Sequence, residues 1–146
     1  MAQPTNEEIV RRYMEAHKSH DYDALEPLRH KDWINDWPQS GERIRGHAND
    51  RLIHDAYPGG LPDEQGLRLV GSEDQWVMTP AFTFQRIVGN GDHWWGAGVG
   101  VYPDGSTWHV AMLLELRDGK VYRETWYFAP PLEAAEWRKA WVEPIS

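Results

Sequence analysis

The sequence of 146 residues contains no cysteine. This absence excludes disulfide bonds, thiol nucleophiles and thiolate metal ligands. Long apolar runs are also missing, and none approaches the roughly 18 residues of a membrane-spanning helix. The first eight residues, MAQPTNEE, lack the apolar core of a secretory signal. We therefore expect a cytoplasmic protein with no membrane partner.

Basic residues are few, because 15 Lys and Arg stand against 23 Asp and Glu and give a net charge of −8. They form no cluster along the chain. Proteins that bind nucleic acids or anionic lipid surfaces usually concentrate positive charge on one surface. We therefore expect no nucleic-acid partner.

Apolar and aromatic residues are plentiful, at 40% hydrophobic with nine Trp, six Tyr and three Phe. This content is enough to bury a core and excludes a disordered chain. The length fits one domain, and neither a repeat nor a linker divides it. We therefore predict a single domain over residues 1–146.

Helical signals occupy the first third of the chain. Thr5 and Glu8 form a capping box, and apolar residues at helical spacing follow it to about His17. A short second helix comes next. A third follows Gly46, and we expect it to point four side chains inward: Leu52, Ile53, Ala56 and Tyr57.

Strand signals fill most of the remainder. We expect strands near 32–37, 67–71 and 75–88, the last bent at Pro80, and three more between 93 and 128. Residues 39–42 fit a loop. A final short helix near 133–141 should dock Trp137 and Trp141 on the body. This order predicts an α+β fold with helices on one face of a mixed, mostly antiparallel sheet.

Two turns set the expected register of the last three strands. Pro103-Asp104-Gly105 and Arg117-Asp118-Gly119 both fit a three-residue hairpin loop with glycine in the left-handed region. Counting back from the loops places glycines, large apolar side chains and one carboxylate on a single face. The expected neighbours on that face are Gly98 with Val110, Val110 with Trp126, Met112 with Glu124, and Leu114 with Tyr122. Such a face resembles the floor of a pocket.

Several local patterns, in this element order, resemble the NTF2-like superfamily and its SnoaL-like group. The matching pieces are Arg12-Tyr13, Asn35-Asp36, the stretch 41–46, Asp118-Gly119-Lys120-Val121 and Trp126-Tyr127-Phe128. The resemblance implies a cone in which a curved, mixed, mostly antiparallel six-stranded sheet wraps around three to four helices. It also implies a deep pocket and, often, a dimer through the outer sheet face. The superfamily includes polyketide cyclases, ketosteroid isomerase and limonene-epoxide hydrolase, so the fold alone does not fix the activity.

The resemblance carries over position by position. The helix tyrosine of ketosteroid isomerase matches Tyr13, and its strand-end general base matches Asp36. Its protonated aspartic acid falls at Met112, which can donate no hydrogen bond. The acid on the last strand of the epoxide hydrolase falls at Trp126. Neither mechanism is therefore reproduced in full.

Three residues are candidate catalytic groups. Glu124 should lie among apolar side chains, which would raise its pKa toward the range useful for proton transfer. The alternatives for Glu124 are exposure at the mouth of the cone or a structural pair with an arginine. Asp36 could act as a base or simply end a strand before Pro38. Tyr13 could stabilise a developing oxyanion or be a core tyrosine with a satisfied hydroxyl.

The expected substrate-binding residues share the pocket face: Trp108, Met112, Trp126, Phe128, Tyr122 and Gly98. The glycines at 96, 98 and 100 lie inside a strand and open no helix, so they do not indicate a nucleotide loop. His17 and His20 have ligand-like spacing, but no third ligand is identifiable, and we expect no metal site. We expect no cofactor either.

These features favour a cofactor-independent enzyme that performs acid–base chemistry on a small, mostly apolar, cyclic molecule. Cyclisation, isomerisation, dehydration and epoxide opening all remain open. The alternative is a non-catalytic binding protein or a dimeric interaction module of the same fold. The other sheet face is too apolar to remain in water, so we expect a homodimer through it. Its residues are Ala97, Val99, His109, Ala111, Leu113, Thr125 and Tyr127.

Overall fold

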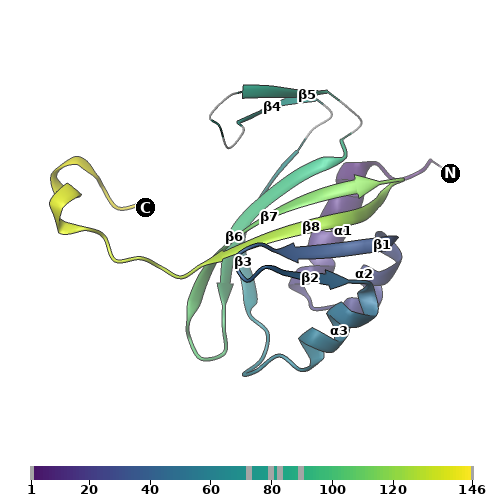
Figure 1. The fold of residues 1–146 in the computed structure, drawn as a ribbon, viewed down its shortest axis with the longest axis horizontal. Helices are drawn as coiled ribbons and strands as arrows, with labels where there is room; N and C mark the ends of the chain where they lie inside the picture. Colours follow the sequence, from purple (N-terminus) through teal and green to yellow (C-terminus); the bar gives the residue numbers. More distant parts are fainter. Residues whose placement is uncertain (1, 72–73, 79–80, 82–83, 89–90, 146) are drawn as a thin grey trace.

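The computed structural model describes residues 2–71, 74–78, 81, 84–88 and 91–145, and a six-stranded sheet dominates it (Figure 1). The strand order is β2 (Glu42–Arg45), β1 (Arg29–Trp37), β8 (Lys120–Ala129), β7 (Thr107–Arg117), β6 (His93–Val101) and β3 (Asp63–Gly71). Only the β1–β8 pair is parallel among these neighbours. The predicted α+β fold with a mixed, mostly antiparallel six-stranded sheet is confirmed.

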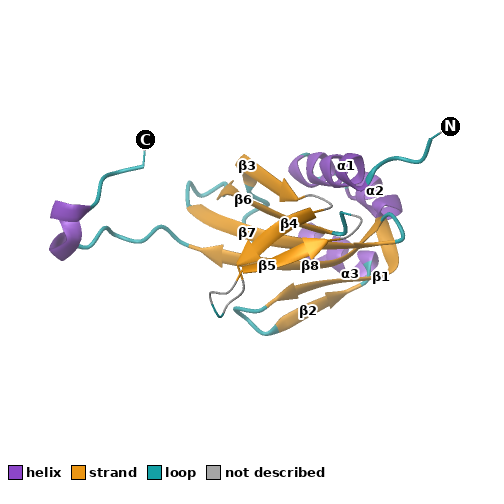
Figure 2. Ribbon diagram, turned by 90° about the horizontal axis from the view of Figure 1, so that it is seen from above, coloured by secondary structure: helices purple, strands orange, loops and turns teal. Residues whose placement is uncertain are grey.

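The helix α1 (Asn6–Lys18) lies against one face of this sheet (Figure 2). Its capping box is confirmed, since the Thr5 hydroxyl accepts from the Glu8 N–H and the Glu8 carboxylate accepts from the Thr5 N–H. The apolar face of α1 is buried with inward side chains of β7 and β8. The buried set includes Ile9, Val10, Tyr13, Met14, Met112, Leu114, Val121 and Trp126. This shared core fixes the position of α1 over the pocket face.

Two short helices complete the helical part. The helix α2 (Tyr22–Leu25) is capped by Asp21 and continues into a 3₁₀ turn, η1 (Glu26–Leu28). The helix α3 (His47–Asp55) follows β2, which the sequence analysis did not predict. None of the described helices is long and apolar enough to cross a membrane.

The inward face of α3 differs from the prediction. Leu52 is 66% exposed and Ile53 is also exposed, whereas Asp50 is almost completely buried. The reason is a buried cation on β1 that pairs with Asp50, as described below. An ion pair, rather than apolar packing, therefore sets the rotation of α3.

The first of the two predicted hairpin loops is confirmed. Tyr102 and Ser106 are hydrogen-bonded across the loop, and Gly105 has φ +86°. The register of β6 on β7 then follows as predicted, with Gly98 opposite Val110 and Gly96 opposite Met112. The last loop position favours glycine, because residues that carry a side chain rarely adopt a backbone conformation with positive φ.

The second hairpin differs from the prediction by two residues. Its loop contains only Asp118 and Gly119, both with positive φ, and Arg117 pairs with Lys120. A bulge follows, so Glu124 pairs with Leu114 and Trp126 pairs with Met112. A shift of two residues keeps each side chain on its face, so Glu124 still points inward.

The segment 75–88 is not one bent strand. It contains two strands, β4 (Asp74–Met78) and β5 (Phe84–Val88), which pair with each other as a separate antiparallel sheet. The predicted bend at Pro80 lies outside the described residues. The hairpin signal Asn90-Gly91 lies partly outside them as well, because Asn90 is not described.

The C-terminal segment leaves the sheet after Ala129 and projects away from it (Figure 1 and Figure 2). It contains one 3₁₀ helix, η2 (Glu136–Trp141). Trp137 and Trp141 are 75% and 77% exposed, so the prediction that they dock on the body is wrong for this chain taken alone.

Candidate functional site

Glu124 on β8 has a side chain with no solvent exposure. One carboxylate oxygen, Oε2, accepts hydrogen bonds from the Tyr13 hydroxyl at 2.6 Å and from Trp33 Nε1 at 2.8 Å. The other, Oε1, accepts from Trp126 Nε1 at 3.1 Å and lies 3.5 Å from His17 Nε2. A buried carboxylate is tolerable only with such a full set of partners.

The donors around Glu124 come from three elements. Tyr13 and His17 stand one turn apart on α1, so both side chains point to the same face of the helix. Trp33 belongs to β1, which pairs in parallel with β8. Trp126 is two residues from Glu124 on β8 and therefore shares its face.

A second layer of charge stands behind this cluster. Arg29 Nε donates to the Tyr13 hydroxyl at 2.8 Å, and Arg29 Nη1 lies 2.8 Å from Asp50 Oδ2. The Arg29 guanidinium also lies over the Trp33 ring, 3.8 Å from its centroid. Glu124, Arg29 and Asp50 thus form a buried chain of alternating charge that joins β8, β1 and α3. Arg29 keeps this interior from carrying two uncompensated negative charges.

Two histidines of α3 surround the Arg29–Asp50 pair. His47 Nδ1 lies 2.8 Å from Arg29 Nη1, and His54 Nδ1 lies 3.2 Å from Asp50 Oδ1. Burial and the charge of Arg29 lower the pKa of His47. Burial also tends to lower the pKa of His54, but the Asp50 carboxylate outweighs it and raises that pKa. The two histidines therefore have opposite protonation tendencies.

The pKa of Glu124 is lowered, not raised as the sequence analysis expected. Burial alone would raise it, but the neighbouring His17 side chain, the charge of Arg29 and the Tyr13 hydroxyl together outweigh burial. The pKa of Tyr13 is raised well above its usual value, first by burial and then by the neighbouring Glu124 charge. The pair is therefore a carboxylate and a neutral phenol, with the phenol as donor.

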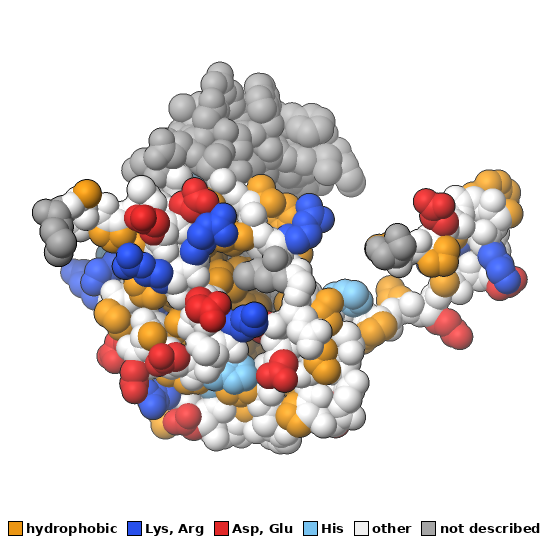
Figure 3. Space-filling view, turned by 180° about the vertical axis from the view of Figure 1, so that it is seen from behind, with side chains coloured by type: hydrophobic (Ala, Val, Ile, Leu, Met, Phe, Trp, Pro, Cys, Tyr) orange, Lys and Arg blue, Asp and Glu red, His pale blue; other side chains and the backbone are white. Residues whose placement is uncertain are grey.

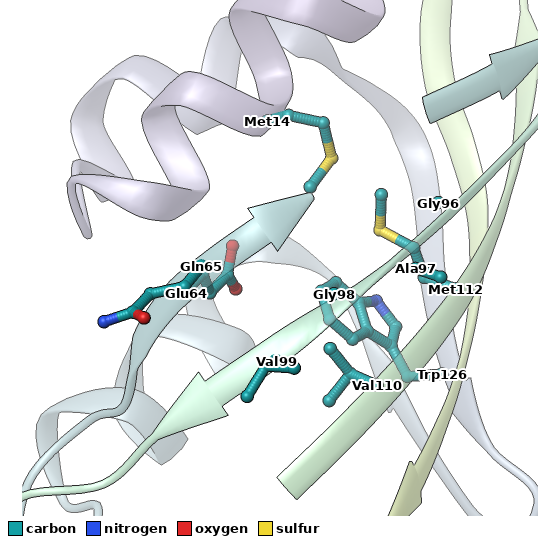
Figure 4. Close-up of a pocket in the computed structure, with 10 residues that line it drawn as sticks. All are labelled: Met14, Glu64, Gln65, Gly96, Ala97, Gly98, Val99, Val110, Met112 and Trp126. Carbon is teal, nitrogen blue, oxygen red and sulfur yellow. The ribbon is translucent and has the colours of Figure 1, made fainter. Parts of the chain in front are cut away.

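An apolar hollow lies beside this cluster, between α1 and the sheet (Figure 4). Its volume is about 10 Å³, which is about the space that one water molecule needs. Trp126, which donates to Glu124, forms part of the wall. The remaining wall comes mainly from Met14, Met112, Val110 and the glycines at 96 and 98. The missing side chains at the two glycines leave this space open.

Glu64 on β3 also lines the hollow, and Figure 4 shows its carboxylate pointing toward the space while the Gln65 amide points away. No hydrogen bond or ion pair to Glu64 appears among the described residues. Glu64 lies opposite Gly100 in the β3–β6 pairing, which gives its side chain room to turn inward. It is therefore the carboxylate at the hollow whose oxygens are available to a ligand.

The structure brings some of the predicted site residues together. Glu124 and Tyr13 are in direct contact, and Gly98, Met112 and Trp126 line the hollow. Phe128 is stacked on Trp126, with ring centroids 6.1 Å apart. Trp108 pairs with Gly100 farther along β7, where its side chain is exposed, and it does not line the hollow.

Two other predicted residues lie elsewhere. Asp36 forms ion pairs with Arg43 and Arg123 at 2.6 Å and 2.7 Å, on the side of the sheet opposite Glu124. Hydrogen bonds from those arginines hold the pKa of Asp36 below its usual value, so it is a poor proton acceptor there. Tyr122 sits at the β7–β8 bulge beside His30 and under the Arg117 guanidinium, away from the hollow. The bulge is the reason, because it changes the alternation of side chains.

Sequence reasoning considered His17 only as a metal ligand, and it missed the other residues that complete the site: Arg29, Trp33, Asp50, His47, His54 and Glu64. Arg29 and Asp50 look like solvated residues, because a charged side chain is rarely buried without a partner. Only Trp33 could have been predicted from the strand pattern. It lies two residues from Asn35 on β1, so it shares the face of Asn35, which pairs with Glu124. Within the described residues, no three acidic or histidine side chains converge as metal ligands.

Comparison with known proteins places this geometry in a family. No protein-family model matches the chain, and no curated protein sequence matches it. A solved NTF2-like protein of unknown function from Burkholderia xenovorans LB400 is 30% identical, with a TM-score of 0.68 over 97% of this chain and 95% of that one. The chain belongs to the NTF2-like family.

Two further solved structures share the fold at lower identity. A candidate ketosteroid isomerase from Kribbella flavida is 20% identical, with a TM-score of 0.68 over 97% of this chain and 90% of that one. An LEH-like epoxide hydrolase from M. tuberculosis is 15% identical, with a TM-score of 0.52 over 82% of this chain and 79% of that one. At these identities the likeness concerns the fold, and NTF2-like proteins of unknown function also match.

Proposed function

We propose that this NTF2-like protein binds a small, mostly apolar, cyclic molecule at the hollow, which must widen from its water-sized volume to admit it, and transfers a proton on it without a cofactor. The observation that carries the proposal is the His17–Glu124 pair, with its nitrogen and oxygen 3.5 Å apart behind the wall of an apolar space. A histidine held by a buried carboxylate is a common arrangement for general acid–base catalysis. Isomerisation, cyclisation, dehydration and epoxide opening each contain such a step.

Each residue of the cluster has a separate role in this proposal. His17, whose ring contacts those of Tyr13 and Trp126, is separated from the hollow by its wall, so the proposal requires Trp126 to move aside before His17 exchanges a proton with the ligand. Glu124 stays ionised and stabilises the imidazolium that forms. Tyr13 and Trp33 both donate hydrogen bonds to Glu124 Oε2, so the carboxylate keeps its orientation during the reaction. Asp36, which sequence reasoning favoured as a base, has no part in it.

Glu64 gives the ligand one polar requirement. A carboxylate at an apolar hollow favours a hydroxyl, an amine or another hydrogen-bond donor at the matching position of the ligand. Trp126 and the two methionines would cover the apolar remainder. We therefore expect cyclic alcohols or amines to bind better than hydrocarbons of the same shape.

A thermal-shift screen of small cyclic compounds, followed by mass spectrometry of the incubated hits, tests the proposal. We expect a hit to be converted, with loss of about 10²–10⁴-fold in turnover for His17→Gln. Glu124→Gln should reduce turnover and shift the pH profile. His93→Gln, which removes an exposed imidazole at the start of β6, is the control and should keep full turnover.

A non-catalytic binding protein is the second candidate. It is favoured by the three donors that already occupy the Glu124 carboxylate and by the position of His17 and Glu124 outside the lining of the hollow. In that case the compounds bind and are released without chemical change, and His17→Gln alters only the affinity for them. Binding that persists without any conversion across the screen would contradict the enzyme proposal.

A further inference from the structure

The C-terminal arm, residues 130–145, carries an unusual amount of uncovered apolar surface. Leu132, Trp137 and Trp141 are 87%, 75% and 77% exposed, and Val142 and Ile145 are exposed as well. Figure 3 shows the arm clear of the body, with its hydrophobic side chains uncovered. Single exposed apolar residues are ordinary, but this many in one short segment indicate a binding surface.

The arm is directed away from its own sheet. It continues from β8, and Pro130 and Pro131 follow the last strand residue directly. Consecutive prolines fix φ and favour extended backbone, so the start of the arm is a stiff spacer, not a hinge. Figure 1 and Figure 2 show the same projection from two directions. A fold-back onto the same body would have to reverse the chain beyond these prolines, between residue 132 and η2.

We propose that the arm docks on a second copy of this chain, and that two copies exchange arms reciprocally. The body offers apolar surface to receive an arm, because Trp95, Leu113 and Tyr127 are exposed on the outer face of the sheet. Tyr127 lies on β8 itself, so this surface is continuous with the strand that the arm prolongs. A symmetric pair would place the same two surfaces in contact twice.

The area supports two arms in one assembly. A tryptophan buries roughly 150–250 Å², so two at three-quarters exposure offer roughly 200–400 Å² in each arm. Counting both arms and the surface they cover gives roughly 800–1,600 Å² from the tryptophans alone. Specific interfaces bury about 1,200–2,000 Å², so adding Leu132, Val142 and Ile145 reaches the usual range.

Charge opposes this contact only weakly. The arm contains three acidic residues, Glu133, Glu136 and Glu143, and two basic ones, Arg138 and Lys139. Its net charge is therefore −1 (two positive minus three negative), although the whole chain carries −8. For its length the arm is about as acidic as the whole chain, so charge adds no attraction and only a weak repulsion to the contact.

Sedimentation equilibrium of three proteins tests the exchange: the full chain, a chain ending at Ala129, and the double variant Trp137→Ser/Trp141→Ser. We expect the full chain to be a dimer, with the dissociation constant raised at least tenfold in both altered proteins. Glu136→Gln/Lys139→Gln changes the polar side of the same helix and should leave the dissociation constant unchanged. Equal dissociation constants for the full and truncated chains would overturn the proposal, and so would a monomeric full chain.

A probe on the arm separates exchange from folding onto the same body. The chain has no cysteine, so Ala140→Cys gives one labelling position for a nitroxide. We expect a broad, immobilised spectrum at high protein concentration that becomes sharp on dilution below the dissociation constant. A spectrum that stays broad in the diluted monomer would show docking on the arm's own body and would refute the exchange.

Discussion

Glu124 is an ionised group that the interior holds in place with neutral donors and one distant cation. Its three hydrogen bonds come from a phenol and two indoles, which cannot neutralise a charge. Arg29 Nη2 stands 3.8 Å away, beyond hydrogen-bond distance. The negative charge therefore remains available to stabilise a cation that forms nearby, and the His17 imidazole is the group at that position.

Replacing Glu124 should reveal this arrangement as a loss of stability. We expect Glu124→Leu to lower the free energy of unfolding by about 3–5 kcal/mol, because it leaves Arg29 buried with one partner carboxylate fewer. Glu124→Gln keeps one acceptor for Tyr13 or Trp33 and should cost less, about 1–3 kcal/mol. Urea denaturation at pH 7 measures both values.

The control is Glu7→Gln, the same chemical change in an exposed pair with Arg11, which should cost less than about 1 kcal/mol. A Glu124→Leu protein as stable as the unaltered chain would contradict the buried charge chain. It would also remove the reason for expecting an ionised Glu124.

Sequence reasoning at this scale found the central residue but not its surroundings. Glu124 and Tyr13 could be predicted, because strand alternation and helical spacing fix the faces that they occupy. The direction of the Glu124 pKa could not, because it depends on His17 and Arg29, whose approach is set by tertiary packing. Arg29 and Asp50 lie in segments that a hydrophobicity pattern assigns to solvent.

At the scale of elements, local turn chemistry decides how far prediction reaches. Pro103-Asp104-Gly105 allowed the β6–β7 register to be derived residue by residue, and it is confirmed. Asp118-Gly119 supports a tighter loop plus a bulge, an alternative of nearly the same composition, so β8 is displaced by two residues. The predicted face of Glu124 and Trp126 is still correct, because a displacement by an even number of residues keeps side chains on the same face. The predicted position of Tyr122 is wrong, because Tyr122 lies at the bulge.

The helix α3 shows the limit of amphipathic reasoning. Its apolar residues Leu52 and Ile53 are exposed, and its buried residue is Asp50. The inward face of α3 could have been predicted only by knowing that an arginine on β1 is buried and pairs with Asp50. The ion pair replaces the hydrophobic stripe that a helix of this kind usually presents to the core.

The two α3 histidines should give folding stability opposite dependences on pH. The raised pKa of His54 contributes stability that is present below about pH 6.5 and is lost as pH rises through its folded-state pKa. The lowered pKa of His47 contributes stability that is present above about pH 6.5 and is lost as pH falls through its folded-state pKa. The two effects offset each other in the unaltered chain.

Urea midpoints between pH 5.5 and 8.5 separate these contributions. His54→Gln should lose most stability at the acidic end of this range and little at the basic end. His47→Gln should remove a destabilisation that otherwise develops on acidification. If both variants change the midpoint equally at every pH, neither histidine is linked to protons in the predicted way.

At the scale of the whole molecule, the two faces of the sheet have different surroundings. The inner face is covered by α1 and holds the charged cluster and the hollow. The outer face carries Leu113 and Tyr127, which are among the exposed large hydrophobic side chains of the body. Such a face in water is unfavourable by roughly 25 cal/mol for each Å² of apolar surface. It therefore favours association with another apolar surface.

We predict a homodimer through this outer face, independent of whether the arms also take part. Leu113→Asp and Tyr127→Asp place a charge at the centre of the expected contact and should produce monomers at tens of micromolar in sedimentation equilibrium. Leu52→Asp is the matched control, because Leu52 is exposed on α3 and lies away from the face, so that variant should remain dimeric.

Far-ultraviolet circular dichroism should be unchanged in all three variants, which excludes unfolding as the cause. A Leu113→Asp protein that dimerises as tightly as the unaltered chain would place the interface elsewhere, and it would also remove this face as the surface that receives the arm.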